Sequence, residues 1–292
     1  MASVQSRKIN PSRFHPSQLK FLIPLTFMGT LMILPIVFIF TTAFKPAEEL
    51  FIFPPAFFVV NPTFDNFREL FSMMEALGGV PASRYFVNSI IIAVLTVLIS
   101  VFLSISAGYI LSKKNFKYRK LLFEINTIAL MFVPIAVTIP RFIIVVQLGL
   151  IDNFLANILP IVAMPIGIFL LKQFIDQVPD ALIEAARIDG AGEIKILFKV
   201  IVPMTMPAIA TVAILSFQSA WGNVEASIFY ITDESLKSFA YFMTTLNVGG
   251  AGTPLLQGVA AASTLIMFVP NLIIFIVMQS KVMNTMAHSG IK

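Results

Sequence analysis

The sequence predicts an all-α polytopic membrane protein with six transmembrane helices and both termini in the cytoplasm. Apolar residues make up 58% of its 292 residues and charged residues only 12%. The mean hydropathy of +0.90 excludes an ordinary soluble globular protein. Several apolar stretches reach the roughly 20 residues that a helix needs to cross the hydrocarbon layer. Because lipid offers the backbone no hydrogen bonds, stretches this long must be helices.

The N-terminal region combines a basic segment with the first predicted span. Residues 1–20 contain four basic side chains and no acidic one, and residues 21–44 form the span. The apolar run is longer than the roughly 7–15 residues of a signal-peptide core, and no small-residue cleavage site follows it. We therefore expect an uncleaved membrane anchor.

The connection over residues 45–88 contains a predicted amphipathic helix. Thr63 can cap its start, and Gly78-Gly79 can end it. Its apolar face consists of Phe64, Phe67, Leu70, Phe71, Met74 and Leu77. Such a helix lies on the membrane surface or packs against the outer ends of the spans, and we favour packing.

Five further apolar stretches complete the predicted bundle. They are residues 89–111, 121–140, 154–175, 204–229 and 258–279. Met131, Pro134 and Pro140 are expected to bend the third span around a pathway. With no internal repeat or low-complexity segment, residues 1–292 form a single transmembrane domain.

The distribution of Lys and Arg predicts the orientation. With both termini inside, cytoplasmic segments hold 15 of the 20 basic residues, and five of these follow the second span within residues 112–120. The outer segments hold the other five, namely Lys45, Arg68, Arg84, Arg141 and Lys237. Since basic residues favour the cytoplasmic side, this excess predicts six spans with cytoplasmic ends.

The longest polar interruption of the C-terminal half, residues 176–203, lies between the fourth and fifth spans. Asp180 can cap a helix whose apolar stripe is Leu182, Ile183, Ala185 and Ala186. Asp189-Gly190 is a stop signal, because glycine adopts the left-handed conformation that ends helices. A second helical pattern runs into Pro203, with Ile194, Leu197, Phe198, Ile201 and Val202 on one side. Two helices joined by a glycine hinge predict a docking element.

This segment resembles the EAA signature of permease subunits in ATP-binding-cassette importers. That signature is Glu-Ala-Ala, three residues, Gly, nine residues and Ile-x-Leu-Pro. The sequence has Glu184-Ala185-Ala186, Gly190 and Val200-Ile201-Val202-Pro203 at the same spacing. Valine replaces Ile and Leu, which keeps the apolar character. Asn61-Pro62-Thr63, Asn88-Ser89, Leu148-Gly149-Leu150 and the Ser289–Lys292 tail also resemble the carbohydrate, maltose-type branch.

The resemblance implies a type I importer permease fold and a set of partners. These are a second, non-identical permease, a dimer of an ATPase subunit, an extracytoplasmic solute-binding protein and a sugar. It implies that Glu184, Ala185, Ala186, Asp189, Gly190 and Pro203 couple the chain to the ATPase. The sequence has no phosphate-binding P-loop. ATP and magnesium are therefore expected on the partner, with no cofactor on this chain.

Polar side chains in the outer half of the fifth predicted span are candidates for a substrate pathway, because polar residues in membrane helices are costly. They are Gln218, Ser219, Trp221, Asn223 and Glu225. Trp221 stacks on a sugar face or anchors the helix at the interface, and Glu225 binds sugar or reaches toward water. The family's sugar permeases often have adjacent Trp-Asn here, whereas Gly222 separates the two in this chain.

Three other polar residues accompany the third predicted span. Glu124 and Asn126 are expected to act in a gate or in packing near its cytoplasmic end. Arg141 is an interfacial residue or a partner for an acid such as Glu225. There is no cysteine, and the two histidines, His15 and His288, lie near opposite ends. We therefore expect no metal site and no catalytic residue.

The favoured function is a permease subunit of an ATP-driven sugar importer, with an oligosaccharide as the expected cargo, in the cytoplasmic membrane of a prokaryote. A permease for another solute such as a polyamine is the first alternative, but such a site needs several acids, and the predicted span interiors offer only Glu124 and Glu225. A membrane enzyme would need a polar catalytic cluster, which the sequence lacks. An ion-coupled transporter is disfavoured, because the elaborate cytoplasmic loop suits an ATPase dock.

Overall fold

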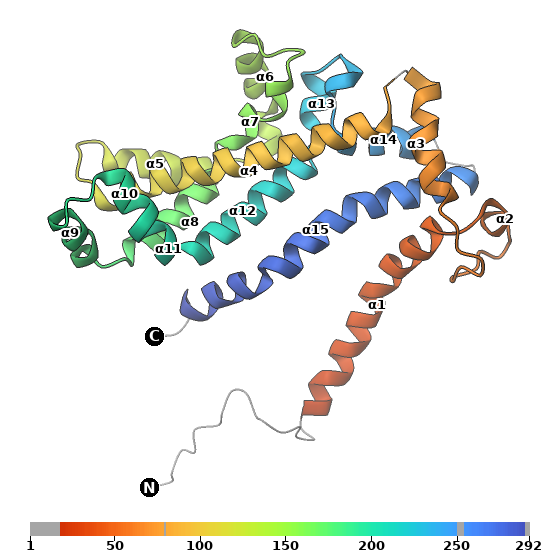
Figure 1. Cartoon of the computed structure of the whole chain (residues 1–292), viewed down its shortest axis with the longest axis horizontal. Helices are drawn as coiled ribbons and strands as arrows, with labels where there is room; N and C mark the ends of the chain where they lie inside the picture. The colour runs from red at the N-terminus through yellow and green to blue at the C-terminus, as the bar shows by residue number, and fades with distance from the viewer. Residues whose placement is uncertain (1–17, 79, 250–253, 290–292) are drawn as a thin grey trace, which may run out of the picture.

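The computed structural model describes residues 18–78, 80–249 and 254–289, and every regular element in these ranges is helical. The three longest helices of the body, α4 (Ala82–Lys113), α12 (Met206–Trp221) and α15 (Pro254–Ser289), run along its long axis (Figure 1). α12 packs against both of the others. The basic N-terminal side chains Arg7, Lys8 and Arg13, both histidine side chains and the last three residues lie outside the described part.

Helix α1 (Leu19–Ala43) confirms the first predicted span. It contains Pro24 and Pro35, and only its last three residues, Thr41, Thr42 and Ala43, are buried. That end contacts α15, where Ala43 packs against Ala261 and Ala262. The rest of α1 leaves the body of the molecule (Figure 1). Its apolar side chains are therefore exposed along most of its length.

The connection after α1 is held by buried polar side chains. The carboxylate of Glu49, in α2 (Ala47–Leu50), accepts the backbone N–H groups of Val60 and Asn61 at 3.0 and 2.7 Å. The Asn66 side chain donates to the carbonyls of Ala43 and Lys45 at 3.0 and 2.7 Å. Together these bonds fix the chain between α1 and the next helix.

Helix α3 (Asp65–Gly78) is the predicted amphipathic helix, and it packs against α15 and α4. Leu70 is fully buried beside Tyr85 and Phe239, which confirms the packing interpretation. Thr63 is not the predicted cap, because its buried hydroxyl has no hydrogen-bond partner among the described residues. The side chains of Met74 and Leu77 lie outside the described part.

Helix α4 is longer than its predicted apolar stretch and forms the centre of the bundle. It packs against α12 and against α8 (Pro165–Asp176). Small residues allow this approach: a Cβ added to Gly108 would lie 3.1 Å from the Lys172 backbone nitrogen. Ser100 adds a hydrogen bond of 3.0 Å to the carbonyl of Val162. Hydropathy marked the lipid-crossing part of α4 but missed its first two turns.

The third and fourth predicted spans are broken rather than continuous. The third comprises α5 (Arg119–Ala129), the 3-10 turn η2 (Pro134–Val137) and α6 (Thr138–Gln147), bent by 110°. The fourth comprises η3 (Phe154–Asn157), α7 (Leu159–Val162) and α8, bent by 43°. Val133 and Met164 have extended backbones at these breaks. Each precedes a proline, which disfavours helical geometry in the preceding residue.

The chain between α8 and α15 contains the predicted loop and the fifth span. The loop consists of α9 (Asp180–Ile188), α10 (Glu193–Ile196), the π-helical turn η4 (Leu197–Ile201) and α11 (Val202–Met204). The span is interrupted at residues 222–224 between α12 and α13 (Glu225–Phe229). The outer loop after it contains η5 (Glu234–Leu236) and α14 (Phe239–Gly249). Phe239 and Phe242 of α14 are buried against α3 and α4.

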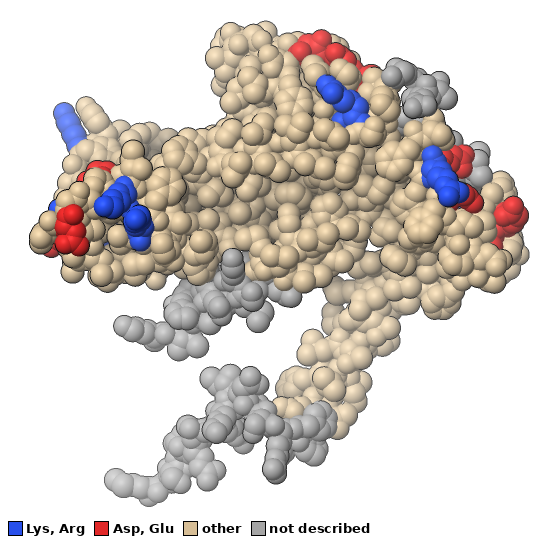
Figure 2. Space-filling model, viewed as in Figure 1, with Lys and Arg blue, Asp and Glu red and all other residues tan. Residues whose placement is uncertain are grey.

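Length and hydropathy identify α1, α4 and residues Leu256–Met278 of α15 as membrane-crossing helices, and up to six spans if each bent pair is one span. In the view of Figure 2, charged side chains gather over α9–α10, over α2–α3 and above α13, with an uncharged surface between them. This distribution agrees with the predicted six-span bundle.

Candidate functional site

The exposed helix α9 is the first candidate site, and it lies at the end of the molecule where α4 and α8 terminate (Figure 1). Its N-cap is Pro179, so Asp180 is the first helical residue rather than the predicted cap. Asp180 pairs with Lys113 at 2.7 Å instead. A carboxylate in the first turn still interacts favourably with the helix dipole.

The hinge after α9 has the predicted left-handed glycine, with φ +72° at Gly190. The N–H of Ala191 bonds the carbonyl of Ala186 at 2.9 Å, and the N–H of Gly190 bonds that of Arg187 at 3.0 Å. These two bonds form the Schellman motif that closes a helix at a glycine. The hinge is therefore a defined turn that sets the orientation of α9 relative to α10.

The predicted coupling residues divide between the two faces of α9. Ile183 is buried and Ala186 packs against the same apolar core. Glu184, Ala185, Asp189 and Gly190 are exposed, as is Pro203 at the junction with the fifth span. Large apolar side chains join them at the surface, with Ile188 86% and Ile194 76% exposed. An anion among small and apolar residues is suited to contact with another protein.

The second part of the loop matches the predicted apolar face only in part, since Leu197 and Ile201 of that face are buried. Ile196, Leu197 and Ile201 are buried, whereas Ile194 and Phe198 are exposed. The π-helical turn η4 explains the difference, since bonding from i to i+5 brings Ile196 and Ile201 onto one side. Nothing in the apolar pattern signals this insertion, and π-turns occur frequently at functional sites.

Ionic contacts tie the loop to the end of α4. Glu193 forms ion pairs with Lys114 and, at 3.4 Å, with Arg187. It also accepts the Tyr109 hydroxyl at 2.6 Å. Together with the Lys113–Asp180 pair, these contacts join α9 and α10 to α4. The basic cluster of residues 112–120, predicted only as an orientation signal, thus also positions the loop.

A polar cavity of about 430 Å³ is the second candidate site. It contains three predicted pathway residues, Ser219, Asn223 and Glu225, and Arg141 also lines it. The rest of its wall comes from both proline breaks and the α12–α13 interruption: Pro134, Pro160, Ile161, Ala163, Met164, Pro165, Gly222 and Val224. A neighbouring cavity of about 420 Å³ shares Pro134, Arg141, Ala163 and Pro165. The cavity thus forms where the spans are broken, and the positions of Pro134 and Pro165 in the sequence could have indicated these breaks.

Two charged side chains in the wall of this cavity, Arg141 and Glu225, interact with each other. Arg141 and Glu225 form an ion pair of 3.0 Å, with side chains 26% and 30% exposed. The Tyr230 hydroxyl donates to Glu225 at 3.1 Å. Arg141 is therefore the partner of Glu225 rather than an interfacial residue. Pairing reduces the cost of two charges in an apolar surrounding.

Trp221 lies in the protein interior, and this corrects both interpretations of its role. Its side chain is 2% exposed and packs among Ile92, Ile158 and Val162. Phe217 stacks on the ring at 5.5 Å, and its Nε1 donates to the Met267 carbonyl at 3.0 Å. A ring enclosed in this way neither stacks on a sugar nor anchors at an interface. Gln218 is exposed and outside the cavity lining.

The other polar residues of the third span have separate positions. Asn126 donates to the Pro165 carbonyl at 3.0 Å and thereby ties α5 to α8, a packing role. Glu124 is exposed. In the part of the chain that the structure describes, no three His, Asp or Glu side chains are grouped to hold a metal.

The outer loop is tied down beside the cavity. The Asp152 carboxylate accepts the backbone N–H groups of Asp233 and Thr232 at 2.8 and 3.0 Å. These bonds hold the pKa of Asp152 below its usual value. Asn88 donates to the carbonyls of Ser235 and Lys237 at 2.8 and 2.9 Å. The loop is thereby fixed to α4 and to the turn before η3.

Comparison with known proteins gives a family and a fold. Residues 100–280 match the family described as "Binding-protein-dependent transport system inner membrane component". The chain is 29% identical over 283 residues to the sulfoquinovosyl glycerol transport system permease protein SmoH of Agrobacterium fabrum, covering 92% of this chain and 94% of that protein. It is also 29% identical to the galactooligosaccharides transport system permease protein GanQ of Bacillus subtilis, covering 92% and 93%.

The fold is similar to a chain in the crystal structure of a bacterial ABC transporter that imports the acidic polysaccharide alginate. The TM-score is 0.78 at 22% identity, with 92% of this chain and 99% of that chain covered. At this identity the match shows the fold, and it agrees with the predicted arrangement of spans.

Proposed function

The chain belongs to the family of binding-protein-dependent transport system inner membrane components, and from this premise we propose that it is one permease subunit of an ATP-driven sugar importer. The subunit is a multi-pass membrane protein that transports rather than catalyses. The single observation that carries the coupling role is α9, an exposed helix with Glu184, Ala185 and Ala186 and a closed glycine hinge. The family's inner-membrane description supports the cytoplasmic membrane of a prokaryote as its location.

A carbohydrate, with an oligosaccharide as the expected cargo, is the proposed substrate. The relatives SmoH and GanQ are named for a sugar glycoside and for oligosaccharides. The cavity at the broken spans supports this assignment, because it combines apolar walls with Ser219, Asn223 and the Arg141–Glu225 pair. Such a mixture of a few polar groups in an apolar wall is typical of sites for small ligands.

The proposed partner of α9 is an ATPase subunit, which would carry ATP and magnesium. Glu184 is exposed, and the structure records no ion pair for it among the described residues. It can therefore pair with a basic residue of the partner, while Ala185 permits close approach. The ionic contacts of Lys113 and Lys114 would transmit a movement of α9 to α4, and α4 contacts α8 and α12, which carry or border the cavity wall.

A second permease subunit and a solute-binding protein complete the proposed assembly. The apolar surface of α1 and α5 is exposed in this chain, which suits contact with lipid and with another membrane subunit. The family description itself names dependence on a binding protein. The cavity is open to the surface in this chain alone, so a second permease is expected to close the pathway around the sugar.

The proposal is tested with the purified importer in proteoliposomes, supplied with its binding protein and ATP. Galactooligosaccharides, sulfoquinovosyl glycerol and spermidine are compared as stimulants of ATP hydrolysis and as transported solutes. One of the sugars should stimulate both activities. Glu184→Lys should abolish the stimulation and release the ATPase from the membrane, because it replaces attraction by repulsion.

Glu48→Lys is the matched control, since Glu48 is also exposed but lies in α2 at the other end of the bundle. It should leave stimulation unchanged. Stimulation by spermidine and by neither sugar would show that the substrate is a polyamine rather than a sugar. A Glu184→Lys importer that keeps its ATPase and responds normally would show that α9 is not the coupling element.

A further inference from the structure

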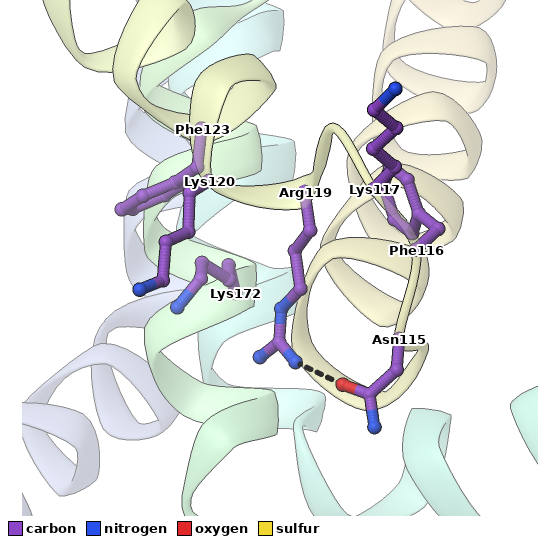
Figure 3. Close-up of a pocket in the computed structure, with 7 residues that line it drawn as sticks. All are labelled: Asn115, Phe116, Lys117, Arg119, Lys120, Phe123 and Lys172. Carbon is purple, nitrogen blue, oxygen red and sulfur yellow. Dashed lines mark hydrogen bonds between the residues drawn. The ribbon is translucent and has the colours of Figure 1, made fainter.

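A basic pocket of about 750 Å³ lies where α4 turns into α5, separate from the polar cavity (Figure 3). Four cationic side chains line it, Lys117, Arg119, Lys120 and Lys172, and no acidic side chain does. Asn115, Phe116 and Phe123 complete the lining. In Figure 3 the ends of Arg119, Lys120 and Lys172 point to one side, whereas that of Lys117 points the opposite way.

Two of these cations are held in place by the protein. Arg119 donates to the carbonyls of Leu111 and Ser112 at 2.7 and 2.8 Å and to the Asn115 side chain at 3.1 Å. It therefore caps the end of α4, where a cation interacts favourably with the helix dipole. Lys172 pairs with Asp176 at 2.6 Å and lies 4.5 Å from the centre of the Phe123 ring.

The pocket keeps an excess of positive charge after its neighbours are counted. Asp176 lies next to it and neutralises Lys172, while also accepting the Ser112 hydroxyl at 2.6 Å. Lys120 is exposed, and the structure records no ion pair for it among the described residues. Arg119 bonds only neutral groups. The pocket therefore offers Arg119 and Lys120, for which the structure records no ion pair among the described residues, and the remaining donors of Lys172.

We propose that this pocket binds the phosphate headgroup of an anionic phospholipid from the cytoplasmic leaflet. Phosphate oxygens suit the guanidinium and ammonium donors. Basic pockets between transmembrane helices on the cytoplasmic side bind such headgroups. Leu121 and Leu122 follow Lys120 in α5 and are exposed, and the exposed apolar surface continues along the helix through Ile125 and Ile128. This surface provides a path along which the acyl chains lie while the headgroup is held at Lys120 and Arg119.

A lipid ligand is favoured over a soluble anion because the cations of the pocket lie beside exposed apolar side chains of Phe116 and α5. A free phosphate would use only the cations. A phospholipid also covers Phe116 and the apolar face of α5, both of which are exposed. The bound lipid would brace the turn between α4 and α5, immediately beside the ion pairs that hold α9 and α10.

Native mass spectrometry of the full-length chain in its purified complex tests the proposal. Phosphatidylglycerol and phosphatidylcholine with the same acyl chains are offered at equal concentration. Wild type should retain phosphatidylglycerol selectively. Lys120→Gln should lower its occupancy roughly fivefold, the effect expected for one basic residue at an anionic membrane surface. Lys117→Gln also removes one positive charge from this turn, but the Lys117 side chain points away from the ends of Arg119, Lys120 and Lys172. Its effect on occupancy should therefore be less than about half that of Lys120→Gln.

Each contrary result overturns a specific part of the proposal. Equal losses in Lys120→Gln and Lys117→Gln would indicate diffuse attraction to anionic lipid without a site. Displacement of phosphatidylglycerol by glycerol 3-phosphate at similar concentration would identify a soluble anion as the ligand. Loss of the ATPase subunit from Lys120→Gln at unchanged lipid occupancy would make the pocket a protein contact.

Discussion

Arg141 and Glu225 are 84 residues apart in the chain, yet one guanidinium nitrogen lies 3.0 Å from both carboxylate oxygens. This pair joins α6 of the third span to α13 of the fifth span. Both helices follow a break in their span, so the ion pair connects two segments that lie beyond these breaks. It also lies in the wall of the polar cavity.

Removing one member of this ion pair should impair transport more than exchanging the two charges. Arg141→Ala and Glu225→Gln each leave one charged or polar group unpaired, and each should lower sugar uptake by reconstituted importer. The exchange Arg141→Glu with Glu225→Arg should restore part of the activity. The coupling energy from a double-mutant cycle on thermal stability should be about 1–2 kcal/mol. A coupling energy near zero would show that the two side chains act independently.

Replacement of Trp221 should reduce stability rather than sugar affinity. Trp221→Ala removes a buried ring and should destabilise the bundle by about 3 kcal/mol or more. Trp221→Phe keeps much of the volume but loses the bond to the Met267 carbonyl, so its loss should be smaller. Thermal unfolding of the purified complex measures both effects. A raised KM for sugar with unchanged stability would return Trp221 to the pathway.

The hinge offers a pair of glycines that differ in conformation. A Cβ at Gly190, where φ is +72°, costs about 1 kcal/mol or more, and Gly190→Val should misplace α9 and reduce sugar-stimulated ATP hydrolysis. Gly192, two residues further, has an ordinary φ of −69°, and a methyl group added there would meet no neighbouring atom within 4 Å. Gly192→Ala should therefore be neutral. Equal activity of the Gly190 and Gly192 variants would contradict a conformational role.

The absence of cysteine makes the orientation directly testable. Ser83, at the start of α4, and Asn115, after its end, are both exposed. Cysteines at these positions should react with a membrane-impermeant maleimide from opposite sides of the membrane. Ser83→Cys should be labelled in intact cells, whereas Asn115→Cys should be labelled only after permeabilisation. Labelling of both in intact cells would refute the predicted orientation.

The sequence predicted the elements that depend on local patterns. Hydropathy located all six apolar stretches, and the spacing from Glu184 to Gly190 located the exposed helix and its left-handed hinge. The prolines indicated bends, although not that residues 121–140 would divide into helices inclined at 110°. A bend angle depends on which helix each half packs against, and this information lies in distant parts of the chain.

The errors share a physical origin in tertiary contacts. An aromatic ring at the outer end of a span can stack on sugar or anchor at the interface, the two interpretations predicted for Trp221, but the approach of α4 and α15 encloses it. The π-helical turn at Leu197–Ile201 shifts the buried face of the loop, and Phe198 within it is exposed. Helix α14 is largely apolar around its circumference rather than amphipathic, so its sequence has no clear helical stripe, although Phe239 and Phe242 are buried.

The exposed surface of α1 has a consequence for biosynthesis. In water, so much uncovered apolar surface would cause aggregation, but acyl chains solvate it at no such cost. The hydrophobic effect therefore cannot recruit a neighbour to α1 within the bilayer, and any recruitment must come from van der Waals packing, interhelical hydrogen bonds or lipid entropy. A newly inserted chain can accordingly persist alone in the membrane until its neighbours are made.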